Sequence, residues 1–116
     1  MNEFEVKRKD VKEVSVVYLK GYLDAHTAPD FEKVLQDLVD ENRVRIVVNL
    51  AELNYISSAG LGVFMGFIED IRKKKGDIKL SEPIDKVFSV LDLLGFPALY
   101  EVFKKEGEAI EKYKAS

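Results

Sequence analysis

The stretch that decides the fold reads VVNLAELNYISSAGLG and runs from Val47 to Gly62. An apolar run ends near Leu50, a short polar turn follows, and a segment with helical apolar spacing opens at Ser57. This order predicts a strand, a loop and the start of a helix. Ser57 and Ser58 are both candidate N-cap residues, because a hydroxyl oxygen at that position can accept a hydrogen bond from a free amide of the first helical turn.

Three small residues, Ala59, Gly60 and Gly62, follow the serines. Small side chains would let another backbone, a phosphate or a partner surface approach this end of the helix closely. The same residues also fit a purely structural role, in which a capped helix uses glycine for close packing. Both interpretations stay open on the residues alone.

Composition limits the class of protein. The chain has 116 residues, 47% hydrophobic and 34% charged, which predicts one globular domain with a single core. It has no cysteine, which excludes disulfides, thiolate metal sites and a cysteine nucleophile. We expect no metal or other cofactor. The net charge of −3 argues against direct binding of nucleic acid. The basic run at residues 72–75 fits the end of a helix, where it complements the dipole and stays in solvent.

The location expected for the protein is the cytoplasm. No apolar run approaches the roughly 18 residues of a membrane-spanning helix, so we expect no membrane partner. Residues 1–4 lack the basic start and apolar core of a signal peptide.

Along the chain, strands and helices are expected to alternate. Residues 4–20 predict a hairpin of two strands separated by the charged segment 7–13. Residues 21–30 predict a turn into a helix that ends near residues 40–43, with Thr27 or Asp24 near its cap and Pro29 in its first turn. The apolar positions of this helix are Phe31, Val34, Leu35, Leu38 and Val39.

The continuous apolar run at residues 44–50 predicts a strand covered on both faces, at the centre of a sheet. The next helix should end at Lys75 and Gly76, with the glycine in a left-handed conformation. Its expected apolar face is Leu61, Phe64, Met65, Ile68 and Ile71. A strand at 77–80, a helix from Pro83 that breaks at 95–97, a short strand at 100–103 and a polar helix at 104–114 complete the prediction.

The predicted fold class is α/β. Strands that alternate with helices imply right-handed crossovers, so we expect a mixed, mostly parallel sheet of about four or five strands flanked by about four helices. Strand-to-helix loops gather at the carboxyl edge of such a sheet, which places residues 49–62 among the best candidates for function.

Catalysis finds little support in the residues. His26 is the only histidine, and with Asp24 and Ser58 it could form a triad, but the glycine-x-serine-x-glycine elbow is absent. Nucleotide binding rests on Gly60-Leu61-Gly62 alone, without a phosphate-binding lysine. An exposed serine at a helix start is, however, a suitable substrate for a kinase. A phosphate there adds about −1.5 to −2 charges, which the helix dipole tolerates and a docked partner does not.

Four segments together resemble a known family. They are Gly21-x-Leu23-Asp24, Ile46–Leu50, Tyr55–Gly62 and Val90-Leu91-x-x-Leu94-Gly95. In order and spacing they look like the anti-sigma factor antagonists built on the STAS domain, and the resemblance covers residues 4–110. It implies that residues 1–116 form a single STAS domain with the STAS-like fold.

In that family the first serine of an Asp-Ser-Ser-Gly helix start is phosphorylated. The resemblance therefore places the phosphorylated serine at Ser58, with Ser57 at the motif aspartate, Ala59 at the second serine, Asp24 at a nearby acidic position and Asn49 where the family carries Asp or Asn. Ser57 is the chief departure from the motif, because it replaces a carboxylate that could help to position the serine for the kinase.

The resemblance also implies the function. Such a protein is not an enzyme: unphosphorylated, it binds an ATP-bound anti-sigma factor serine kinase and so releases a sigma factor. Phosphorylation ends that binding, and a metal-dependent serine phosphatase restores it. We expect a monomer or a weak dimer. Two alternatives stay open, a STAS scaffold without a phosphate switch and a small nucleotide- or anion-binding module. The residues expected to bind the partner are Asp24, His26, Thr27, Asn49, Ser57, Ser58, Ala59, Gly60 and Gly62.

Overall fold

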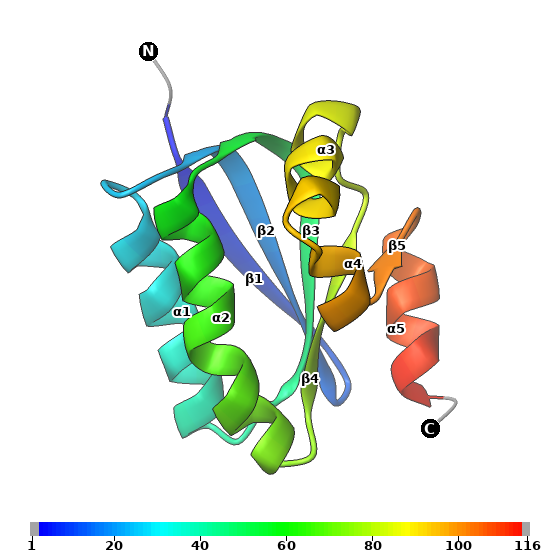
Figure 1. The fold of residues 1–116 in the computed structure, drawn as a ribbon. Coiled ribbons are helices and arrows are strands. Elements are labelled where there is room, and N and C mark those ends of the chain that lie inside the picture. Colours follow the sequence, from blue (N-terminus) through cyan, green and yellow to red (C-terminus); the bar gives the residue numbers. More distant parts are fainter. Residues whose placement is uncertain (1–2, 115–116) are drawn as a thin grey trace.

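The computed structural model describes residues 3–114, which form one five-stranded sheet and five helices (Figure 1). Residues 1–2, part of the segment 1–4 that was expected not to begin a signal peptide, and residues 115–116 of the expected domain lie outside this range. The strands are β1 (Glu5–Val11), β2 (Val14–Leu23), β3 (Arg45–Ile56), β4 (Asp77–Ser81) and β5 (Val102–Phe103). The helices are α1 (Ala28–Asp40), α2 (Ser58–Lys73), α3 (Asp85–Leu93), α4 (Phe96–Leu99) and α5 (Glu106–Lys114).

The sheet has the order β1-β2-β3-β4-β5, with β3 at its centre. β1 pairs antiparallel with β2, and all the other pairs are parallel. The predicted fold class, a mixed and mostly parallel sheet with helices, is therefore confirmed, and so is the central position of the strand that begins near Val44.

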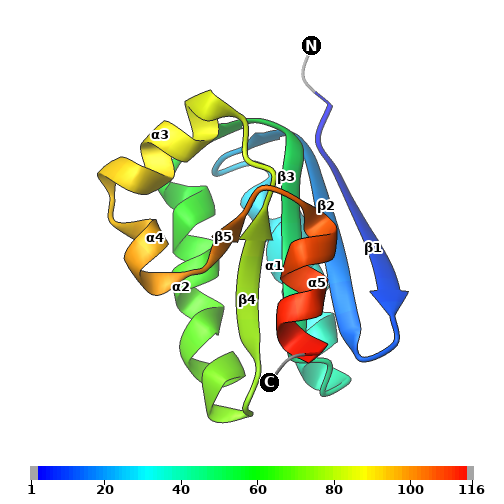
Figure 2. The same ribbon diagram turned by 90° about the vertical axis from the view of Figure 1, so that its right-hand side faces the viewer.

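The helices form layers on both faces of the sheet. α1 and α2 cover one face, and α5 lies alone on the other (Figures 1 and 2). Alternation along β3 divides the core: Val48 and Leu50 join the large cluster that includes residues of α1, α2 and α3, whereas Val47 joins a smaller cluster with Ala109 and Tyr113 of α5. α3 and α4 contribute buried side chains to the large cluster and so extend the first layer.

Two predicted loops are strand in the structure. The charged segment 7–13 was expected between the hairpin strands, but β1 continues through it to Val11, because an edge strand can carry charged side chains toward water. The polar turn expected after Leu50 is also wrong, since β3 continues to Ile56 and pairs with β2 as far as Leu23. The pairing of β2 with β3 contains two register shifts, between Tyr18 and Lys20 and between Gly21 and Tyr22. Such shifts interrupt the regular alternation of side chains between the two faces of the sheet.

The end of α2 differs from the prediction in one detail. Lys75, not Gly76, takes the left-handed conformation, with φ of 68°. Gly76 is required for a different reason: a Cβ there would lie 2.0 Å from the carbonyl oxygen of Val44, so only glycine lets the chain pass the start of β3.

Two further corrections concern apolar residues. Met65 was expected on the buried face of α2, but its side chain is 52% exposed. The break at residues 95–97 contains the short helix α4, which brings Phe96 and Tyr100 into a stacked pair with ring centroids 4.9 Å apart. The hydroxyl of Tyr100 is buried without a hydrogen-bond partner among the described residues, and burial raises the pKa of this tyrosine to about 12.

Candidate partner-binding site

Ser57 is the residue that joins β3 directly to α2. Its N–H donates to the carbonyl oxygen of Leu23 at 2.9 Å, which ties the end of β3 to the end of β2. Its backbone is extended, with φ of −100° and ψ of 174°, and its Oγ accepts a hydrogen bond from the N–H of Gly60 at 3.4 Å. Ser57, rather than Ser58, is therefore the N-cap of α2, and its side chain provides an acceptor for one of the free amides at the helix start.

Ser58 is the first residue of α2, and its side chain is exposed. Its hydroxyl makes no hydrogen bond with any of residues 3–114. The first turn of α2 contains no acidic residue, so the positive end of its dipole is not compensated there. Ser58 thus presents a free hydroxyl at a helix end that favours a negative group.

The small residues near the serines have different surroundings. Gly60 is buried, and a Cβ at this position would lie 2.7 Å from Cγ of Leu23 and 3.1 Å from Cγ1 of Ile56. Glycine is therefore needed here for internal packing, which sets the start of α2 against the end of β2. Ala59 is exposed, and Gly62 is exposed with open space for 4 Å around the position that a Cβ would take, so only these two leave room for a partner.

Asp24 and Thr27 hold the loop that precedes α1 in a fixed shape. Oδ1 of Asp24 accepts from the N–H groups of His26 at 2.9 Å and Thr27 at 3.2 Å. Oγ1 of Thr27 donates to the carbonyl oxygen of Tyr22 at 2.8 Å and accepts from the N–H of Asp24 at 2.9 Å. Because the loop follows Leu23, which is bonded to Ser57, it lies beside the start of α2 (Figure 1).

The structure therefore brings seven of the nine expected partner-binding residues to exposed or half-exposed positions at one edge of the molecule, and their arrangement does not form a catalytic triad. Oδ1 of Asp24 bonds backbone amides, and the imidazole of His26 is exposed and has no bond to Ser58 within the described residues. We call the following residues the Ser58 surface: Asp24, His26, Thr27, Ser57, Ser58, Ala59 and Gly62.

Asn49 lies apart from this surface, on the α5 face of the sheet. It is only 8% exposed, its Nδ2 donates to Oε1 of Glu106 at 3.0 Å, and its Oδ1 accepts from the N–H of Ala51 at 2.9 Å. Glu106 is the first residue of α5, and its N–H donates to Oε2 of Glu82 at 2.7 Å. Asn49 thus anchors the start of α5, and we do not expect it to touch a partner. The alternation of β3, with Val48 and Leu50 on the opposite side, is the sequence signal that could have shown this.

Glu82 and Glu106 also change the pKa of Tyr18, which pairs with Asn49 in the sheet register. Burial, together with a hydrogen bond to Glu106 and the nearby charge of Glu82, raises the pKa of Tyr18 to about 12. The side chains of Asn49, Glu82 and Glu106 therefore form a hydrogen-bonded structural network at the start of α5.

Sequence reasoning missed several exposed leucines. Leu93 and Leu94 at the end of α3 are 84% and 56% exposed, and Leu99 of α4 is 49% exposed. α3 lies at the same end of the sheet as the start of α2 (Figures 1 and 2). The prediction placed Leu94 on the apolar face of the helix from Pro83, which is wrong, because α3 ends at Leu93 and Leu94 is its exposed C-cap.

Comparison with known proteins identifies the family of this chain. It matches the STAS domain family over residues 5–109. It is 28% identical over 104 residues to the anti-sigma-B factor antagonist of Listeria monocytogenes, with 90% of each chain covered. The chain therefore belongs to the STAS domain family, and the resemblance seen in its four segments is confirmed.

Solved structures agree with this fold. An anti-sigma factor antagonist from Mycobacterium paratuberculosis matches with a TM-score of 0.86 at 21% identity, over 95% of this chain and 93% of that one. The anti-sigma factor antagonist SpoIIAA in its unphosphorylated form matches with a TM-score of 0.81 at 23% identity, over 98% of both chains. The phosphorylated form of SpoIIAA, from Bacillus, gives 0.72 at 21% identity, over 96% and 99%. Within residues 3–114, no helix is both long and apolar enough to cross a membrane.

Proposed function

We propose that this chain is an anti-sigma factor antagonist that binds its partner through the Ser58 surface and is released when Ser58 is phosphorylated. The names of its relatives support the first part of the proposal. The observation that supports the second part is that the two serines have different roles. Ser57 caps α2, so the hydroxyl of Ser58 is not needed for capping and is available for phosphorylation.

The replacement of the motif aspartate by Ser57 is compatible with this function. Serine and aspartate are both strong N-cap residues, so the helix start keeps its geometry. The replacement removes one negative charge next to the proposed phosphorylated serine, and a phosphate at Ser58 would otherwise face that charge at close range. We expect the phosphate to be accommodated by the free amides and the dipole of α2.

The proposed partner is a serine kinase with ATP bound. Oγ of Ser58 would attack the γ-phosphorus of ATP, the new Oγ–P bond would form as the bond to ADP breaks, and the hydroxyl proton would pass to a base of the kinase. The chain itself is then a substrate and a ligand rather than an enzyme. A metal-dependent serine phosphatase would hydrolyse the phosphate and restore binding. We place this cycle in the cytoplasm and assign it to one STAS domain that acts as a monomer or a weak dimer.

A phosphate at the centre of an interface is sufficient for a switch. An uncompensated like charge or a desolvated dianion costs several kcal/mol, and each 1.4 kcal/mol is tenfold in affinity. The existing fold should survive, because Ser58 is exposed and its hydroxyl takes no part in the core.

Incubation with the cognate kinase and ATP, followed by mass spectrometry, tests the assignment. We expect a single phosphate on Ser58, none on the Ser58→Ala variant, and normal phosphorylation of a variant altered at the exposed Ser89. Phosphate on Ser57, or none at all with a kinase that is shown to bind, would contradict the proposal and favour a scaffold role without a switch.

A further inference from the structure

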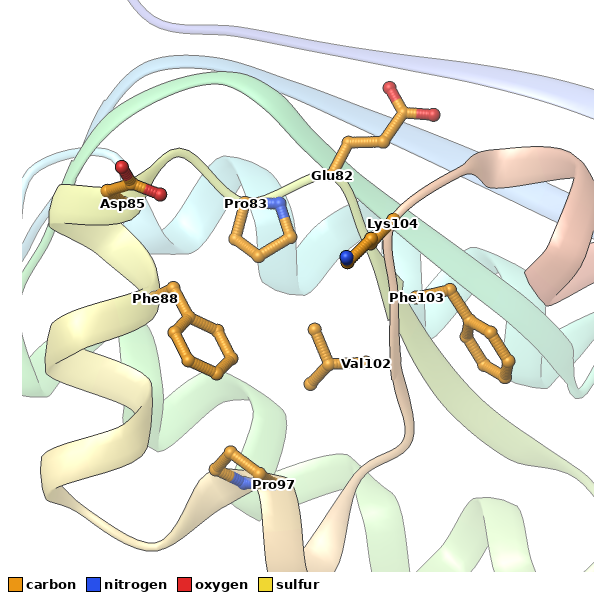
Figure 3. Close-up of a pocket in the computed structure, with 8 residues that line it drawn as sticks. All are labelled: Glu82, Pro83, Asp85, Phe88, Pro97, Val102, Phe103 and Lys104. Carbon is orange, nitrogen blue, oxygen red and sulfur yellow. The ribbon is translucent and has the colours of Figure 1, made fainter.

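A pocket separate from the Ser58 surface lies between α3, α4 and β5 (Figure 3). Its volume is about 520 Å³, which falls within the range of about 300–1,000 Å³ that is typical of small-molecule sites. The side chains of Pro83, Phe88, Pro97 and Val102 surround the space. The two prolines have no N–H and so add no backbone donor to this wall.

Lys104 supplies the one positive side chain among the residues that line the pocket. It lies two residues after Val102, and the period of an extended chain puts both side chains on the same side while Phe103 points away (Figure 3). Its ammonium group makes no ion pair or hydrogen bond with residues 3–114. Lys104 thus offers an unpaired charge beside an apolar space.

The backbone of β5 adds a second donor. Leu80 and Glu82 donate their N–H groups to the carbonyl oxygens of Glu101 and Phe103. In a parallel pair, successive residues point their backbone groups to opposite sides, so the N–H of Val102 faces away from β4, toward the free edge of the sheet. This N–H and the ammonium of Lys104 are both donors, which suits a ligand with acceptor oxygens.

Two carboxylates lie at the rim of the pocket. Glu82 points away from the apolar side chains (Figure 3), and its oxygens are held by the N–H of Glu106 at 2.7 Å and by Asn49 at 3.5 Å. Asp85 is exposed in the first turn of α3. Lys104 is therefore the positive group of the pocket, and the carboxylates of Glu82 and Asp85 weaken its field from the rim.

We propose that this pocket binds a small carboxylate with an apolar body, whose carboxylate pairs with Lys104 and whose body lies among Phe88, Val102 and the two prolines. The ligand is defined by this chemistry: an acceptor anion at one end and an alkyl or aryl group at the other. Binding here does not depend on phosphorylation at Ser58, so this proposal stands or falls independently of the proposed function.

Titration with 4-phenylbutyrate and with the matched alcohol 4-phenylbutan-1-ol, followed by NMR of backbone amides, tests the proposal. We expect the carboxylate to shift the amides of Phe88, Val102 and Lys104, and the alcohol to bind about three- to tenfold more weakly, as for the loss of one charge-assisted hydrogen bond at a partly exposed site. No shift at these amides, or equal binding of the two compounds, would overturn it.

Three exposed positions provide variants with little risk to the fold. Lys104→Gln should remove the preference for the carboxylate, whereas Lys105→Gln, at the neighbouring exposed lysine, should keep it. Asp85→Asn should strengthen carboxylate binding and leave binding of the alcohol unchanged, because it removes a like charge at the rim. Equal effects of the two lysine variants would show that general surface charge, and not this pocket, attracts the ligand.

Discussion

Alanine replacements at Ser57 and Ser58 separate the capping serine from the free one. Ser57→Ala removes the side-chain acceptor for the N–H of Gly60, and loss of an N-cap usually costs about 0.5–2 kcal/mol. Because the hydrogen bond is long, at 3.4 Å, we expect a value near the lower end, about 0.5–1 kcal/mol. For a domain of this size, 1 kcal/mol lowers Tm by about 4 °C, so the expected fall is about 2–4 °C.

Ser58→Ala should leave Tm unchanged or raise it slightly, because the exposed hydroxyl makes no hydrogen bond with the described residues and alanine has the higher helix propensity. Calorimetry and urea unfolding of both variants measure the difference, with Ser57→Asp as the control that restores a capping oxygen. A loss at Ser58→Ala as large as that at Ser57→Ala, or a failure of Ser57→Asp to recover the stability, would refute the division of roles between the serines.

Three other predictions concern packing and ionisation. Gly60→Ala should cost about 1–3 kcal/mol through its clash with Leu23, while Gly62→Ala, in open space, should be neutral or stabilising in the same urea assay. Tyr113→Phe should cost about 1–3 kcal/mol, because its hydroxyl bonds the backbone of Ile46 and Asp77, whereas Tyr100→Phe removes a hydroxyl without a partner among residues 3–114 and should cost nothing. Burial raises the pKa of Tyr100 to about 12, whereas in the unfolded chain this tyrosine ionises near pH 10. The stability linked to its neutral hydroxyl should therefore be complete below about pH 10 and fall toward pH 12. Tyr100→Phe should make this loss of stability shallower in urea titrations across this pH range.

The fold was accessible to sequence reasoning because its apolar patterns are strong. The continuous run of β3 predicted a strand covered on both faces, and helical spacing predicted α1 and most of α2. Thr27 and Pro29 were correctly placed at the start of α1. These predictions succeeded because the buried face of a helix or strand is apolar, so the spacing of apolar residues in the sequence indicates the type of element.

The boundaries that were wrong depend on neighbours distant in sequence. The polar residues 51–56 extend β3 because β2 continues beside them, and no local propensity shows this pairing. Likewise, Gly76 is needed because Val44 passes close to it, a contact between segments that lie far apart in the sequence.

The candidate site was predicted in part for a similar reason. Both serines were recognised as possible caps, but the extended backbone of Ser57 and the bond from the N–H of Gly60 to its Oγ decide between them, and the sequence alone does not show where the strand ends and the helix begins. Asn49 was grouped with the serines through the family motif, although strand alternation places it on the other face. The pocket near Lys104 escaped notice because it joins three elements that show no common motif.

The most direct test of the proposed switch is the affinity of the purified partner kinase for this chain before and after phosphorylation of Ser58, measured by isothermal titration calorimetry. We predict tight binding of the unphosphorylated protein and a loss of about 100-fold or more after phosphorylation, since a penalty of roughly 3 kcal/mol corresponds to that factor. The Ser58→Ala variant should bind normally and be insensitive to kinase and ATP. Equal affinity of the two forms, with phosphate verified on Ser58, would contradict the central claim.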